Sequence, residues 1–184
     1  MTKKLLVYNM PEDVLEILNK YQDKYEFETI EATNIHLNQK VGHILEDNID
    51  ENKENPELEH IDINFLMLHN FTNEELDGFL KDMKEESLII PNKCISTDTN
   101  KEWILHDLLK ENKEESELMP ILHGLYSLRS AGEKILKNTE DKELEEGISK
   151  INSLIESKNF EKEEMRQLYN NVAKICNKHL TKEQ

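Results

Sequence analysis

The chain of 184 residues is 36% hydrophobic and 34% charged, and its formal net charge at pH 7 is −16. This length suits one domain, or one domain with an appendage, and it allows a core without disulfide staples. The acidic charge argues against direct binding to nucleic acid or to an anionic membrane, because both require a surplus of Lys and Arg, and it favours a basic protein as partner.

Several features of the chain predict a cytoplasmic protein. Cys94 and Cys176 lie far apart in the sequence, so we expect two reduced thiols rather than a disulfide framework. The apolar run after Met1 ends before Asn9, which is too short for a signal peptide, and it is better interpreted as a first strand. No apolar stretch approaches the roughly 20 residues of a membrane-spanning helix.

The negative charge is unevenly distributed along the chain. Residues 1–60 carry 14 acidic and 6 basic side chains, residues 61–115 carry 13 and 6, and residues 116–184 carry 12 and 11. The hydrophobic pattern also changes near residue 115. We therefore predict an acidic α/β domain over residues 1–115 and a nearly neutral three-helix module over residues 116–184.

The first part of the chain is predicted to contain strand, helix, strand and helix. The apolar run 5–8 indicates a strand, and Pro11 suits the first position of the helix that follows it. Residues 25–29 alternate with period two, as a half-buried strand does. Asn38 is then predicted to cap a second helix, whose apolar face would begin at Val41.

A polar, acidic segment separates this part from the next. Residues 46–59 hold seven carboxylates against Lys53, together with Pro56, so we predict a mobile linker over residues 47–60. A run of this kind is usually a solvated loop, and the alternative is an acidic surface that captures a basic partner or mimics nucleic acid. Mimicry requires carboxylates at regular spacing on rigid elements, which a linker does not provide.

The apolar pattern returns with a strand over residues 65–68. The helix that follows has two start signals: Thr72 and Glu75 match a capping box, and Phe71 and Leu76 match a hydrophobic staple. The box predicts that the helix begins directly after Thr72.

The end of the α/β part shows a weaker strand and a further helix start. Strand-like residues between 88 and 95 are interrupted by Pro91, which favours an edge strand or a bulge. Thr99 and Glu102 match a second capping box, in which Trp103 occupies the staple position. Core packing is the favoured role for Trp103, and a contact with a partner protein is the alternative.

The two halves of the α/β part share their order of elements. Residues 7–9 are similar to residues 68–70, and residues 38–41 are similar to residues 100–103. This suggests two β-α-β-α repeats that pack edge to edge. The predicted fold class is α/β, with a small four-stranded sheet, flanking helices and a C-terminal helical bundle.

The C-terminal part shows three amphipathic stripes at helical spacing. Helices of this kind form a bundle, pack onto the α/β domain, or pair with a second copy of the chain in a homodimer, and the sequence leaves these alternatives open. The first stripe runs through Leu118, Ile121, Leu122, Leu125, Leu128, Ile135 and Leu136, the second through Leu144, Ile148, Ile151 and Ile155, and the third through Met165, Leu168, Tyr169, Val172, Ile175, Cys176 and His179.

Residues 65–80 and 96–111 resemble a small bacterial family, domain of unknown function 3783. The resemblance extends over about residues 61–115 and is weaker over residues 5–16, and its most specific part is the motif formed by Thr99, Asn100 and Trp103 after a strand. It implies a small α/β fold in a bacterial cytosol, without an activity to carry over. The C-terminal helices lie outside it.

The candidate site lies at the carboxyl ends of the predicted strands, where open α/β sheets bind ligands. The functional interpretation is that His69, Asn70, Asp98 and Asn100 converge as a polar pocket. The structural interpretation is that these residues are helix caps and turn residues. Together with Trp103, they are the candidate residues for binding a partner or a ligand.

Other kinds of site find little support. The segments after the strands lack the glycines that let backbone amides hold a phosphate, so we expect no nucleotide and no other cofactor. The seven His residues show no ligand spacing with acids or Cys, so we expect no metal. No motif of a catalytic nucleophile is present, so we expect no catalytic residues.

These observations favour a non-enzymatic interaction or regulatory protein. Its acidic α/β domain would contact another protein, preferably a basic one, and the C-terminal helices would supply a second contact or a homodimer interface. Two alternatives stay open: an acidic competitor for a nucleic-acid-binding surface, and a small-ligand binder or enzyme that uses the pocket at the strand ends.

Overall fold

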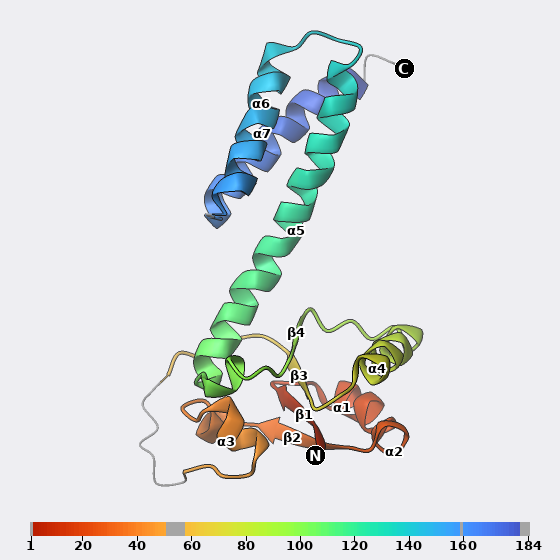
Figure 1. The fold of residues 1–184 in the computed structure, drawn as a ribbon, viewed down its shortest axis with the longest axis vertical. Coiled ribbons are helices and arrows are strands. Elements are labelled where there is room, and N and C mark those ends of the chain that lie inside the picture. Colours follow the sequence, from red (N-terminus) through yellow and green to blue (C-terminus); the bar gives the residue numbers. More distant parts are fainter. Residues whose placement is uncertain (1, 51–57, 159, 181–184) are drawn as a thin grey trace. The chain divides into compact units, whose positions relative to one another are not determined.

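The computed structural model describes residues 2–50, 58–158 and 160–180. The chain divides into two compact units, residues 1–114 and 115–184. Within the described residues, the first unit contains a four-stranded mixed sheet with helices on both faces, and the second contains helices alone (Figure 1). The predicted fold class is therefore confirmed.

The sheet consists of two parallel strand pairs whose inner strands pair with each other in antiparallel orientation. Its order is β2-β1-β3-β4, in which β1 (Lys3–Tyr8) pairs parallel with β2 (Phe27–Ala32), and β3 (Phe65–His69) pairs parallel with β4 (Asn92–Ile95). The central pair, β1 and β3, is antiparallel. The carboxyl ends of the two parallel pairs therefore lie at opposite ends of the sheet.

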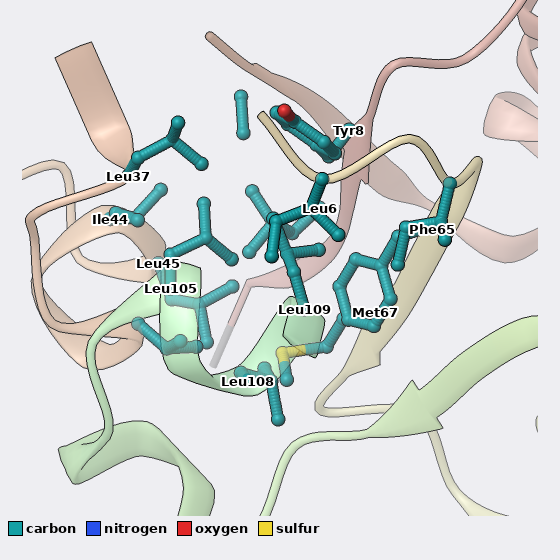
Figure 2. Packing of buried hydrophobic residues seen from close by; sticks show 14 residues of the cluster. Leu6, Tyr8, Leu37, Ile44, Leu45, Phe65, Met67, Leu105, Leu108 and Leu109 are labelled. Carbon is teal, nitrogen blue, oxygen red and sulfur yellow. The ribbon is translucent and has the colours of Figure 1, made fainter. Parts of the chain in front are cut away.

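Side chains alternate between two cores, one on each face of the sheet. On the first face, Leu6 and Met67 of the central strands pack against α3 (Val41–Leu45) and the first turns of α5 (Leu105–Leu136), as Figure 2 shows. On the other face, side chains of β1 and β3 pack against α1 (Glu12–Asn19), α2 (Gln22–Tyr25) and α4 (Asn73–Glu85). Because successive side chains of a strand point to opposite faces of the sheet, each central strand contributes side chains to both cores.

An internal two-fold relates the halves of this unit. In the antiparallel ladder Leu6 faces Met67, while Tyr8 faces Phe65 and Lys4 faces His69. The pairing is thus symmetric about its centre.

The same relation recurs outside the sheet, where Lys40 and Ile104 form an isolated antiparallel bridge. The amide of Val41 donates to the carbonyl of Trp103, and the amide of Leu105 donates to the carbonyl of Gln39, both at 2.9 Å. Gln39 of the first half therefore corresponds to Trp103 of the second.

The structure confirms the predicted correspondence of residues 7–9 with 68–70, but it shows a different register after the second strand of each half. Residues 33–41 correspond to residues 97–105, whereas the sequence similarity paired 38–41 with 100–103. Each half closes its loop with a threonine. Thr33 caps the 3-10 helix η1 (Asn34–His36) with His36 as partner, and Thr97 exchanges two hydrogen bonds with Asn100.

Of the three predicted side-chain caps, one is confirmed and two are wrong. The hydroxyl of Thr72 accepts from the amide of Glu75, whose carboxylate accepts from the amide of Thr72, as the capping box predicts. Thr99 makes no side-chain cap, because the 3-10 helix η2 (Asn100–Glu102) follows it and α5 begins only at Leu105. The helix α3 begins after Lys40, so Asn38 is not its cap.

The predicted linker lies partly outside the described residues, since residues 51–57 are not described. The described residues on either side of this gap contact other parts of the first unit. The Gln39 side chain hydrogen-bonds both the carbonyl and the amide of Asp50, and Ile49 and Leu58 pack against the core of the first face. His106 Nε2 lies 3.2 Å from the carbonyl of Glu59.

The second unit is a three-helix arrangement with its own core. The remainder of α5 packs with α6 (Lys142–Ser157) and α7 (Lys162–Leu180) around Leu125, Ile151 and Met165, which are fully buried. The helix predicted after Trp103 and the first helix of the C-terminal module form one continuous helix, α5, which contains Pro120. The change of hydrophobic pattern near residue 115, which predicted a domain boundary, therefore falls inside one helix.

Candidate functional site

A cavity of about 470 Å³ lies at the carboxyl ends of β3 and β4, lined by residues 68–71, the first turn of α4 and residues 95–98. His69 Nδ1 lies 2.7 Å from the hydroxyl of Ser96, and both side chains are half-buried. Burial lowers the pKa of His69, and the positive charges of Lys101 and Lys4 lower it further. The imidazole is thus neutral at physiological pH.

Two of the predicted site residues hold the local backbone through their side chains. Asn70 adopts a positive φ of 61°, and its amide group donates to the carbonyl of Thr2 at 3.1 Å. The Asn100 side chain accepts from the amide of Thr97 at 2.7 Å and donates to the carbonyl of Ile95 at 2.9 Å. Both side chains thus make the hydrogen bonds expected of turn residues.

Asp98 lies at the rim of the same cavity. Its carboxylate is exposed and sits 3.0 Å from Lys101 Nζ. The structure therefore brings His69, Asn70 and Asp98 to one cavity, while Asn100 closes the loop behind it.

Trp103 is exposed, so its predicted core role is wrong. Its exposed fraction is 38%, and among the described residues it belongs to none of the three cores. A staple position exists only if the helix begins just before it, but α5 begins two residues later, at Leu105. Trp103 instead has an extended backbone with ψ of 151°, and its carbonyl holds Val41.

The segment just before this tryptophan, η2, packs against the start of α3 through charged residues of both elements. Glu102 is exposed and pairs with Lys40 at 2.7 Å, a contact that lowers the pKa of its carboxyl. The start of α3 packs closely on η2, because a Cβ added to Gly42 would meet the Lys101 carbonyl at 3.2 Å. We call Trp103, the exposed residues of 98–102 and the exposed side of α3, with His43 and Glu46, the Trp103 surface.

The first half of the unit has a corresponding cavity of about 330 Å³, lined by Tyr8, Asn9, residues 32–35 and His60. Tyr8 and Ala32 there take the places of His69 and Ser96. Tyr8 Oη lies 3.5 Å from His60 Nδ1, and burial raises the pKa of the phenol. The His–Ser pair therefore belongs to the second half alone.

Sequence reasoning missed the parts of this site that depend on tertiary structure. Ser96 lay inside the segment predicted to line the pocket, and its position directly after a strand was the available signal. His43 and Glu46 come from the other half of the repeat. Only the correct register of the repeat could have placed them beside Trp103.

Within its described residues, the second unit has two cavities between α6 and α7, of about 490 and 410 Å³, and several partly exposed large apolar side chains. Met119 and Tyr126 are partly exposed and share one side of α5, being seven residues apart. Tyr169 is also exposed, but its ring packs against Gly124, which lies on another side of that helix. These side chains do not form one continuous patch, and pairing of two copies through these helices stays a prediction.

Within the described part of the chain, no group of three or more His, Cys, Asp or Glu side chains is arranged to hold a metal ion. Over the same residues, no helix combines the length and the apolar character needed to span a membrane.

A family model described as Domain of unknown function (DUF3783) matches residues 64–119. The match includes β3, α4, β4, η2 and the first half of α5. It therefore covers the residues that line the cavity beside His69, and it also covers Trp103. The resemblance inferred from the sequence is thereby confirmed, and the C-terminal helices α6 and α7 lie outside it. No curated protein and no solved structure matches the chain.

Proposed function

We propose that this chain is a non-enzymatic interaction protein whose Trp103 surface binds a basic partner protein. The observation that carries the proposal is the exposure of Trp103, the single tryptophan of the sequence, in the acidic first unit and directly after the exposed Glu102.

An exposed tryptophan among acids suits a basic contact for two reasons. Its large apolar ring gains free energy when a partner removes it from water, and tryptophan is enriched among residues that dominate binding. The face of the ring also attracts Arg and Lys side chains. A basic side chain over the Trp103 ring would lie close to Glu102 as well.

The charge of the first unit supports the same class of partner. Residues 1–115 carry 27 acidic and 12 basic side chains, whereas residues 116–184 are almost balanced. The field of the first unit therefore accelerates encounters with a basic protein. The neutral His69 adds no positive charge to oppose it.

Competition for a nucleic-acid-binding surface is less well supported. Asp98 and Glu102 each form an ion pair with a lysine, Lys101 and Lys40 respectively. Carboxylates that are paired in this way do not imitate the regular row of negative charges along a nucleic-acid backbone.

The proposal can be tested by site-specific photo-crosslinking in a native cell lysate. A benzophenone amino acid replaces Trp103 in one full-length protein and Ile89, which is 82% exposed in the loop before β4, in a control. We expect one basic protein to be crosslinked from position 103 and not from position 89.

Competition with unlabelled protein completes the test. Wild-type competitor should abolish the adduct, whereas a Trp103→Ala competitor should not. Equal adducts from positions 103 and 89, or equal competition by both proteins, would contradict the proposed function.

A further inference from the structure

The internal two-fold gives the Trp103 surface a counterpart within the same unit. Gln39 occupies the corresponding place in the first half, as the reciprocal hydrogen bonds with Leu105 and Val41 show. Gln39 is only 4% exposed, whereas Trp103 is 38% exposed. The two halves thus differ in what lies over this position.

In the first half, the chain itself covers the position. After α3, residues 47–50 cross the Gln39 side chain without regular secondary structure. The Gln39 amide group donates to the carbonyl of Asp50 at 2.9 Å and its oxygen accepts from the amide of Asp50 at 3.3 Å, while Ile49 packs against the core. The fold therefore already holds a segment without helix or strand at this place.

In the second half, the chain takes another course. Where the first half ends its helix at Leu45 and turns back, α5 continues to Leu136. The segment that would correspond to residues 47–50 is thus part of a helix and does not return over Trp103. The place stays partly open, with an indole where the first half has an amide.

We infer that an extended, basic segment of the partner protein crosses Trp103 in the way that residues 47–50 cross Gln39. This inference rests on the proposed function and specifies the shape and charge of what the Trp103 surface binds. The indole offers one N–H donor and no acceptor, so it cannot repeat the paired backbone bonds of Gln39. Binding at Trp103 therefore depends on packing over the ring.

Charge decides which segment fits. The chain's own covering segment carries Asp47 and Asp50, and residues 1–115 carry 27 acidic against 12 basic side chains, so the first unit repels a further acidic segment although Asp98 and Glu102 are paired with Lys101 and Lys40. A segment with Arg or Lys places its aliphatic stem on the ring and its charge beside these carboxylates.

A peptide library displayed on phage and selected on the immobilised full-length protein tests this inference. Parallel selections use Trp103→Gln, which introduces the residue of the first half, and Ile89→Ala as an exposed control. We expect the wild type and Ile89→Ala to enrich peptides with Arg or Lys next to an aliphatic residue. We expect Trp103→Gln to lose about tenfold or more of this enrichment.

The outcomes separate this inference from the proposed function. Enrichment that depends on Trp103 but selects regularly helical basic motifs overturns the inference and leaves the proposed contact standing, whereas enrichment of acidic motifs contradicts both. Enrichment that Trp103→Gln does not change overturns the inference, while photo-crosslinking at position 103 independently decides the proposed function.

A second variant guards against loss of the fold. Thermal unfolding shows whether Trp103→Gln is folded. Glu102→Gln removes one rim carboxylate from an exposed ion pair, which contributes little to stability. We expect it to weaken the enrichment of basic peptides several-fold, and unchanged enrichment would count against the charge part of the inference.

Discussion

At the scale of single residues, the two asparagines that end the central strands play the same part in each half. Asn9 and Asn70 follow β1 and β3 directly and adopt positive φ values of 50° and 61°. Asparagine tolerates this left-handed conformation better than other residues that carry a Cβ. Asn70 therefore has the backbone role that the sequence offered as one of two interpretations, and its candidate ligand-binding role stays a prediction.

We expect Asn70→Ala to destabilise the protein by about 1–2 kcal/mol, because alanine is strained at positive φ and the bond to the Thr2 carbonyl is lost. Asn70→Gly should cost less, since glycine adopts this conformation freely. Urea unfolding measures both, with Asn73→Ala inside α4 as the control. Equal losses for Ala and Gly would show that the hydrogen bond, and not the backbone conformation, matters.

Glu75 is the residue whose charge state is most clearly tied to the fold. A hydrogen bond from Lys3, and then one from the Thr72 amide, lower the pKa of Glu75 from 4.5 to about 2. Because the pKa is lowered in the folded state, its contribution to stability is complete above the unfolded value. It is lost as the pH falls towards 2.

We therefore expect the urea midpoint of the wild type to fall between about pH 5 and pH 2 more steeply than that of Glu75→Gln. Glu85→Gln, on the same helix but outside the cap, serves as the matched control. If Glu75→Gln and the wild type show parallel pH profiles, the capping box contributes nothing through its charge.

At the scale of elements, prediction succeeded where a local pattern was sufficient. The apolar runs of β1 and β3 and the capping box of α4 needed no tertiary information. The apolar residues 88–90 were expected to contribute to a strand, yet β4 begins at Asn92, with Ile89 exposed and Ile90 buried in the preceding loop. An apolar run alone does not distinguish a strand from a loop that covers a core.

Packing between α6 and α7 depends on a close approach at Gly147. A Cβ added there would lie 2.9 Å from Cγ2 of Val172, which is buried. We expect Gly147→Ala to destabilise by roughly 1–2 kcal/mol, because overpacking outweighs the better helix propensity of alanine.

A double-mutant cycle checks this explanation. In a Val172→Ala background the obstructing methyl groups are gone, so Gly147→Ala should become neutral or stabilising there. Thermal unfolding of the four proteins gives the coupling energy. Strictly additive effects would show that the two residues do not meet in the way that the structure places them.

At the scale of the whole molecule, the repeat and the register of its first strands were predictable, but the register after the second strands was not. The order of elements revealed two halves, but the corresponding residues differ chemically, as Gln39 and Trp103 show. The exposure of Trp103 depends on a segment that covers one half and continues as α5 in the other. No local sequence pattern shows that the second half lacks this covering segment, so the sequence favoured the wrong role for Trp103.

The charge of the first unit predicts how binding responds to salt. Attraction between an acidic surface and a basic partner is screened as ionic strength rises, mainly through slower association. We expect the affinity for the crosslinked partner to fall several-fold between low and physiological salt. Association that is equally fast at both salt concentrations would contradict a role for the acidic charge.

Fluorescence of Trp103 tests the central claim most directly, because it is the single tryptophan of the sequence. The full-length protein is titrated with the partner identified by crosslinking at position 103, and binding is followed independently by anisotropy of a label on the partner. If the partner covers Trp103, its emission should shift to shorter wavelength in proportion to binding, and acrylamide should quench it less. Saturated binding with unchanged emission and unchanged quenching would contradict the account.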